Sequence, residues 1–99
     1  MTEKLYNDDG EVAIAVSHGF GAGWSTWGSV DPLDARFNRL IMYEMWEEAE
    51  KLADSEGLYT GGLRDCRLHW LKPGTRFRIE EYDGAESLVT EDTYKFGTA

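Results

Sequence analysis

Only one stretch of this chain, residues 31–54, has the apolar spacing of an amphipathic helix. The apolar residues that recur every three or four positions are Phe37, Ile41, Met45, Ala49 and Leu52. That spacing places them on one helical face, which has to be buried against another element. Asp31 followed by Pro32 is typical of a helix start, and Gly57 is typical of the left-handed residue after a helix end. If the segment forms two helices, a short one and a longer one, we expect the break at Asn38.

Alternating apolar residues predict strands before and after this helix. Residues 11–16 carry apolar side chains on both faces, which is typical of a central strand covered on both sides. Residues 24–27 are a candidate for a short second strand. Residues 64–71, 75–82 and 87–91 predict a β meander, because Pro-Gly and Asp-Gly dipeptides lie between them.

The expected fold is therefore α+β. We expect a largely antiparallel sheet of about five strands packed against one main helix, in the order ββαβββ, because this arrangement buries the apolar faces of both. The 99 residues suit a single domain over positions 1–99, since domains usually span roughly 50 to 250 residues.

Acidic residues dominate the charge of the chain. Its 19 Asp and Glu outnumber 10 Lys and Arg, and the formal net charge of −9 argues against a protein that coats nucleic acid through phosphate contacts. The acids are concentrated in residues 44–56, with a net charge of −5, and in residues 80–92, with a net charge of −6. Residues 64–78 between them carry a net charge of +4.

The acidic segments and the basic segment each have two interpretations. The helical acids either form a solvated outer face that keeps the protein soluble, or they dock on a basic groove of a partner. Arg76 and Arg78 share a face of their predicted strand. They either pair with Glu80 or neighbouring carboxylates, or bind a phosphate or carboxylate group of a ligand.

No motif indicates catalysis, a bound metal or a cofactor. The glycine-rich residues 19–23 match neither a P-loop nor a dinucleotide fingerprint, since no Gly-Lys-Ser/Thr and no helix follows them directly. They either let the backbone pass a bulky tryptophan or form the wall of a ligand site, in which Trp24 or Trp27 stacks on a planar ring. His18 and His69 have no spacing typical of a metal site or a catalytic dyad. We therefore expect a non-enzymatic protein without cofactor or metal.

Cys66 is the only cysteine, so we expect a small core residue, no internal disulfide and no cysteine-based metal site. The sequence shows no signal-peptide or lipidation pattern and no apolar run as long as a membrane span. We therefore expect a cytoplasmic protein that contacts no membrane.

Five segments of the chain carry distinctive combinations of glycine, aromatic and acidic residues. They are LYNDDGEVA at 5–13, GFGAGWSTW at 19–27, YTGG at 59–62, WLKPGTRFRI at 70–79 and EYDGAES at 81–87. Together they resemble a family of small proteins encoded by phages and bacteria, most of whose members have no assigned activity. The Asp8-Asp9 pair departs from the family's simpler Asn-Asp-Gly turn and lengthens that turn. The resemblance implies a phage or mobile-element setting, in which small acidic proteins often inhibit host defence, as anti-CRISPR proteins do.

Our first hypothesis is a non-enzymatic inhibitor that binds a host defence protein through an acidic surface. The residues expected to meet lysines and arginines of that partner are Glu44, Glu47, Glu48 and Glu50 of the helix and Asp83 and Glu86 of the hairpin. Complementary charge would raise the association rate and select the partner.

A second hypothesis, from a different class, is a small-ligand binder that sequesters a nucleotide-derived immune signal. The residues expected to bind it are Trp24, Trp27, Arg76, Arg78 and Asp83. The tryptophans would stack on the base, the arginines would pair with phosphate, and the aspartate would accept from ribose or base. Such a pocket suits an interface between copies of the chain, and hence a homo-oligomer. A third hypothesis is a structural or assembly accessory protein.

Overall fold

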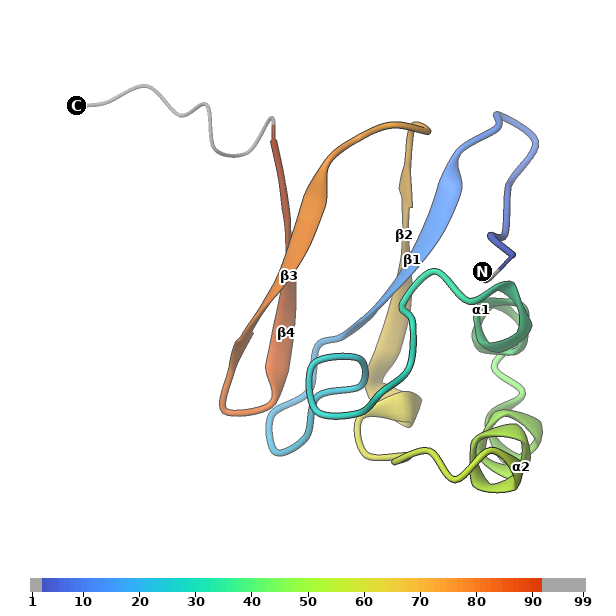
Figure 1. Cartoon of the computed structure of the whole chain (residues 1–99), viewed down its shortest axis with the longest axis vertical. Coiled ribbons are helices and arrows are strands. Elements are labelled where there is room, and N and C mark those ends of the chain that lie inside the picture. Colours follow the sequence, from blue (N-terminus) through green and yellow to red (C-terminus); the bar gives the residue numbers. More distant parts are fainter. Residues whose placement is uncertain (1–2, 92–99) are drawn as a thin grey trace.

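A computed structural model describes residues 3–91, which form an α+β fold of three layers (Figure 1). The elements in chain order are β1 (Val12–Ser17), α1 (Ala35–Met42), α2 (Trp46–Ser55), the 3-10 turn η1 (Leu63–Asp65), β2 (Cys66–Leu71), β3 (Phe77–Tyr82) and β4 (Ala85–Thr90). β1 pairs antiparallel with β2, and β3 with β4, so the described part holds two separate two-stranded sheets. In Figure 1 the β1–β2 sheet lies between the β3–β4 hairpin and the two helices.

The expected α+β class is confirmed, whereas the expected five-stranded sheet in the order ββαβββ does not form within residues 3–91. Residues 24–27 form a turn instead of a short second strand. The N–H of Gly28 donates to the carbonyl of Trp24 at 3.1 Å and closes the turn, while the N–H of Thr26 donates to the side chain of Glu86 at 2.9 Å. These backbone groups are therefore satisfied without a neighbouring strand.

The helix predicted for residues 31–54 is two helices, and the break falls at Glu44 instead of Asn38. Glu44 has a positive φ of 55°, which a continuous α-helix does not accommodate. Asn38 is buried inside α1, where its Nδ2 donates to the carbonyls of Ala13 and Pro32 at 3.2 and 2.9 Å. This asparagine therefore ties α1 to β1 and does not interrupt the helix.

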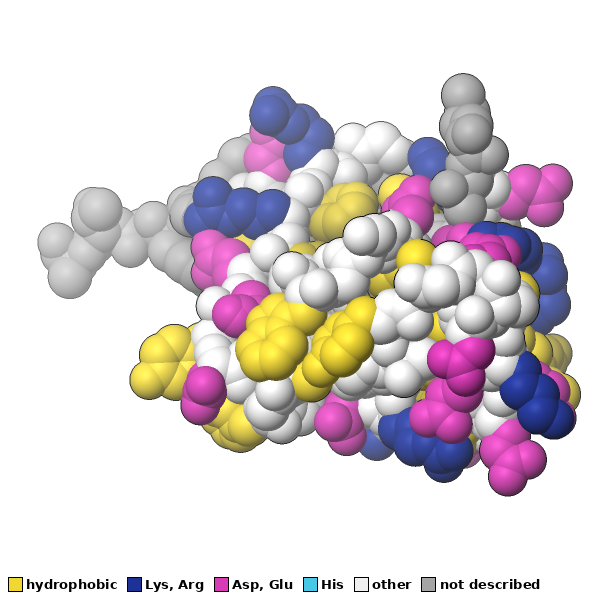
Figure 2. Space-filling model, turned by 60° about the horizontal axis from the view of Figure 1, so that its bottom comes forward, with side chains coloured by type: hydrophobic (Ala, Val, Ile, Leu, Met, Phe, Trp, Pro, Cys, Tyr) yellow, Lys and Arg dark blue, Asp and Glu magenta, His cyan; other side chains and the backbone are white. Residues whose placement is uncertain are grey.

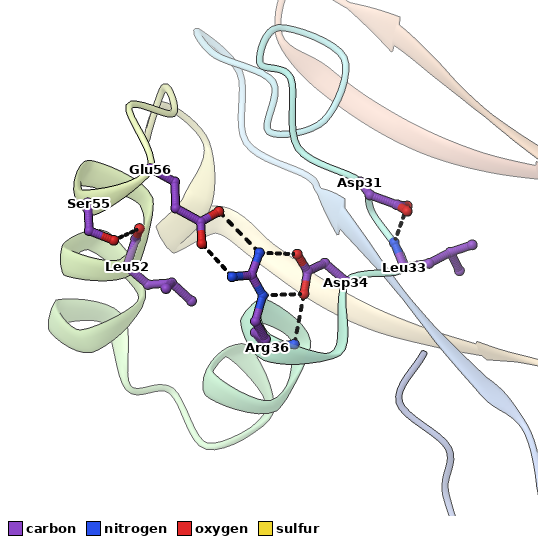
Figure 3. A network of polar contacts seen from close by, with 7 residues as sticks. All are labelled: Asp31, Leu33, Asp34, Arg36, Leu52, Ser55 and Glu56. Carbon is purple, nitrogen blue, oxygen red and sulfur yellow. Dashed lines mark hydrogen bonds and ion pairs between the residues drawn. The ribbon is translucent and has the colours of Figure 1, made fainter. Parts of the chain in front are cut away.

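A charged network holds the two helices together (Figure 3). The N-cap of α1 is Asp34 rather than Asp31, and its carboxylate accepts from the N–H of Arg36 at 2.9 Å. The guanidinium of Arg36 also pairs with Asp34 at 2.9 Å and with Glu56, the residue just after α2. Gly57 follows with a positive φ of 69°, as predicted for the residue beyond the helix end. The network thus fixes the start of α1 against the end of α2.

β1 is the centre of the fold, and all six of its residues are buried, which confirms the prediction of a strand covered on both faces. Ala13 and Ala15 belong to the core clusters that include the helices. Val12 and Ile14 alternate with them and line a small hollow together with Phe77 of β3. One strand therefore joins the helical layer to the hairpin layer.

Candidate functional site

Three segments that are far apart in the sequence meet at one end of the molecule, the lower end in Figure 1. They are residues 18–28 after β1, residues 57–62 after α2 and residues 81–87 around the β3–β4 turn, and we call them together the loop end. The N–H of Gly21 donates to the carbonyl of Asp83 at 2.8 Å, which joins the first segment to the third. The motifs GFGAGWSTW, YTGG and EYDGAES all fall within the loop end.

Two glycines allow these segments to approach each other closely. A Cβ on Gly84 would lie 2.3 Å from the backbone nitrogen of Ala22, and one on Gly62 would lie 2.7 Å from the carbonyl oxygen of the same residue. Both glycines also have a positive φ, 88° and 82°, a conformation that other residues rarely adopt. Gly62 and Gly84 therefore serve close backbone packing.

Trp24 fixes the glycine-rich segment to the core. Its side chain is completely buried and packs edge-on against Phe37 of α1, with 5.3 Å between the ring centroids. This packing agrees with the interpretation in which the glycines let the backbone pass a bulky ring. The ligand hypothesis is wrong for this residue, because a ring without exposed surface cannot stack on a ligand.

Glu86 connects the hairpin to the rest of the loop end. Its side chain is buried, and one carboxylate oxygen accepts from the N–H of Ser17 at 2.9 Å. The other oxygen accepts from the N–H and the hydroxyl of Thr26, at 2.9 and 2.6 Å. The expectation that Glu86 meets basic side chains of a partner is wrong, because its charge is buried and satisfied by these three hydrogen bonds.

Four aromatic side chains stand exposed around the loop end. Phe20, Trp27, Tyr59 and Tyr82 have relative exposures of 73, 47, 49 and 78%. The indole Nε1 of Trp27 donates to the carboxylate of Glu81 at 3.2 Å, which holds the ring in place. Figure 2, which brings this end forward, shows apolar side chains gathered in its middle and at one side. We call these four residues the aromatic face.

The helical acids of the first hypothesis divide into two groups. Glu50 is engaged within the molecule, since its carboxylate pairs with Arg64 at 2.8 Å, and this hydrogen bond lowers the pKa of Glu50. Glu44, Glu47 and Glu48 are exposed, and within residues 3–91 none of them has a basic group at ion-pair distance. Only the second group has carboxylates open to a partner.

Asp83 and Glu81 add exposed carboxylates beside the aromatic face. Asp83 has a φ of 53° and Gly84 follows at 88°, which is the two-residue hairpin turn that the Asp-Gly dipeptide predicted. Figure 2 shows acidic side chains on both sides of the exposed apolar ones. The loop end therefore combines apolar rings with negative charge.

The structure brings only two residues of the ligand hypothesis together, since Trp27 and Asp83 both lie at the loop end. Trp27 contacts the end of β3, whereas Arg76 and Arg78 lie at its start, about 10–17 Å away along an extended strand. Arg76 pairs with Glu91 at 3.6 Å and Arg78 pairs with Glu80 at 2.5 Å, so both arginines pair with neighbouring carboxylates. They line a separate hollow of about 340 Å³ at that end of the hairpin.

Two histidines meet where the loop end begins, which sequence reasoning missed. Nε2 of His18 and Nε2 of His69 are 2.9 Å apart. In the β1–β2 register His69 lies opposite Ile14, whereas the N–H of His18 donates to the carbonyl of Asp65 at 3.2 Å. No spacing rule pairs them, because their side chains reach toward each other from positions that are not opposite. Burial, and secondarily the charge of His18, lowers the pKa of His69.

Within residues 3–91, no group of three or more His, Cys, Asp or Glu side chains is placed to hold a metal ion. No helix of that part is long and apolar enough to cross a bilayer. Comparisons with protein-family models, curated proteins and solved structures found no match to this chain. The function therefore has to be inferred from the loop end itself.

Proposed function

We propose that this chain is a non-enzymatic binding protein that inhibits a host defence component by stoichiometric contact, with the aromatic face at the centre of the contact. The observation that carries the proposal is the exposure of four aromatic side chains at one end of a chain of 99 residues. Aromatic residues are enriched in the centres of protein interfaces, and grouped exposed apolar surface on a small protein marks a contact site. Host defence as the target follows from the phage setting that the resemblance implies.

The surroundings of the aromatic face favour a basic partner. Glu81 and Asp83 expose carboxylates beside it, and Glu47 and Glu48 expose carboxylates on α2. Lysine and arginine side chains of a partner would pair with these carboxylates and stack on the ring faces, since aromatic rings attract cations. Charge complementarity of this kind also speeds association and disfavours acidic partners.

The rigidity of the loop end supports the same proposal. Glu86 holds Thr26, the neighbour of Trp27, through two hydrogen bonds. Gly84 packs against the backbone of Ala22, two residues after Phe20. Because these segments are already fixed in the free protein, little conformational entropy is lost when a partner binds.

The test begins with capture of proteins from a defence-bearing host on the immobilised chain, followed by identification of the captured protein by mass spectrometry. Affinity and inhibition are then measured with that protein for wild type, Trp27→Ala and Tyr59→Ala. We expect each variant to bind at least about tenfold more weakly, as for interface aromatics that contribute 1.4 kcal/mol or more. The matched control is Tyr6→Ala, because Tyr6 is 54% exposed and bridges to Val12 at the opposite end of β1.

Charge reversal tests the basic character of the partner. The double variant Glu81→Lys/Asp83→Lys is expected to slow association and to weaken its salt dependence, because it cancels the negative charge beside the aromatic face. The triple variant Glu44→Lys/Glu47→Lys/Glu48→Lys measures the contribution of α2 separately.

The proposal would be contradicted if Trp27→Ala and Tyr59→Ala inhibited as strongly as the wild type while their circular dichroism spectra were unchanged. Recovery of a nucleotide in place of a protein would favour the ligand hypothesis.

A further inference from the structure

We propose that His18 and His69 form a two-histidine site for a divalent transition-metal ion such as Zn²⁺, Ni²⁺ or Cu²⁺. Their Nε2 atoms face each other at 2.9 Å, so the Nε2–H of one ring donates a hydrogen bond and the Nε2 lone pair of the other ring accepts it. A metal ion that replaces this hydrogen bond lies to one side of the Nε2–Nε2 line and binds a lone pair from each ring. The former donor ring then carries its proton on Nδ1, and two neutral rings release no net proton.

The two nitrogens lie close enough for a pivot of the rings to bring both onto one ion. Two nitrogens bound at 2.0–2.1 Å are about 2.9 Å apart in the cis positions of a square-planar or octahedral ion, and about 3.4 Å apart in a tetrahedral one. The observed Nε2–Nε2 distance of 2.9 Å is the length of the hydrogen bond, and the ring centroids are 5.1 Å apart, so the two rings face each other nearly head to head. Both rings therefore have to pivot before their lone pairs point at one ion. A tetrahedral Zn²⁺ requires the pair to open by about 0.5 Å, a small pivot of two side chains.

The setting of the pair also favours an ion. His18 is exposed, so an ion has access from solvent. The backbone of His69 is fixed in β2 opposite Ile14, and that of His18 is fixed by its hydrogen bond to Asp65. The remaining coordination positions fall to water, since no third ligand is grouped with the pair within the described residues.

The sequence makes the test simple, because the chain has two histidines in all and its one cysteine is buried. Untagged protein is titrated with Ni²⁺ and with Zn²⁺ by isothermal calorimetry near neutral pH. We expect one site and a higher Tm in the presence of the ion, because an ion that binds the native chain stabilises it. His18→Ala and His69→Ala are each expected to weaken binding at least tenfold and to abolish the rise in Tm.

A matched control is Glu48→Gln, which removes one exposed carboxylate and is expected to leave metal affinity unchanged. Metal binding that survives in both histidine variants would place the ion on surface carboxylates and overturn the proposal, as would no binding at millimolar metal. If His69→Ala fails to fold, NMR of the wild type gives a second readout. One equivalent of Zn²⁺ is expected to shift the ring signals of both histidines together, and a shift of one ring alone overturns the proposal. None of these outcomes depends on the proposed host partner.

Discussion

The carboxylate of Glu86 accepts from both the backbone N–H and the side-chain hydroxyl of Thr26, across 60 residues of sequence. A third hydrogen bond, from the N–H of Ser17, completes the contact at 2.9 Å. A buried carboxylate without a cation is tolerated only when dipoles of this kind satisfy it. The same three hydrogen bonds connect the hairpin layer to β1 and to the glycine-rich segment.

Replacing Glu86 by glutamine should destabilise the fold, although the side chain keeps its size. The amide has one acceptor oxygen, so its NH₂ group would face a backbone N–H donor in the position of the second oxygen. We expect the free energy of unfolding to fall by about 1.5–3 kcal/mol, the usual value of hydrogen bonds to a charged group. Urea denaturation measures this loss. The control, Glu81→Gln, alters an exposed carboxylate and is expected to change stability by less than about 0.5 kcal/mol.

The close packing at Gly84 can be separated from its backbone conformation by comparison with Gly74. The two glycines have φ values of 88° and 85°, but a Cβ on Gly74 meets no atom within 4 Å. Gly74→Ala is expected to cost about 1–2 kcal/mol for the left-handed conformation alone. Gly84→Ala should cost about 1–3 kcal/mol more, because the new methyl group clashes with the backbone of Ala22. If urea denaturation gave the same loss of unfolding free energy for Gly74→Ala and Gly84→Ala, the hairpin turn would not pack on the backbone of Ala22.

Cys66 should resist thiol reagents while the protein is folded. Its side chain is 1% exposed, and burial, followed by the charges of Glu86 and Asp65, raises the pKa of its thiol. The thiolate is the reactive form, so both effects slow the reaction. We expect labelling at mildly alkaline pH to occur only as fast as the chain unfolds, and within seconds to minutes in denaturant. Native-state labelling at the rate of a free thiol would refute the burial of the Cys66 side chain.

The pairing of Glu50 with Arg64 should be visible in acid titration. Because the pKa of Glu50 is lowered by the hydrogen bond from Arg64, the stability it contributes is present above the unfolded pKa, about 4.3. That stability is lost as the pH falls through the lower folded pKa. NMR titration of the Glu50 carboxyl should therefore give a midpoint below that of a free glutamate. Arg64→Ala should move the midpoint upward, and an unchanged midpoint would contradict the pairing.

The structural features that could be predicted from the sequence are determined by residues that are close together along the chain. The two apolar faces of residues 11–16 are enough to predict a covered strand, since side chains alternate along any strand. The Asp83-Gly84 turn and the glycine after α2 could be predicted because positive φ is a local property of these residue types. Each of these predictions is confirmed.

The features that sequence could not predict depend on contacts between distant segments. Glu86 lies among other acids in the sequence, and only the folding of β4 beside the loop shows that it is buried. The approach of His18 to His69 likewise requires both the β1–β2 pairing and the turn of the chain after β1. The break at Glu44 could not be read from helical periodicity, because the apolar spacing continues across it.

The assembly of the loop end from three distant segments means that the proposed contact surface is a conformational epitope. A linear peptide copied from residues 18–28 would carry Phe20 and Trp27 but neither Tyr59 nor Tyr82. It would also lack the carboxylate of Glu86, which accepts a hydrogen bond from the N–H of Thr26 and so holds the turn at residues 24–27. Peptides from this sequence should therefore fail to replace the protein, and inhibition should disappear at the same denaturant concentration as the fold.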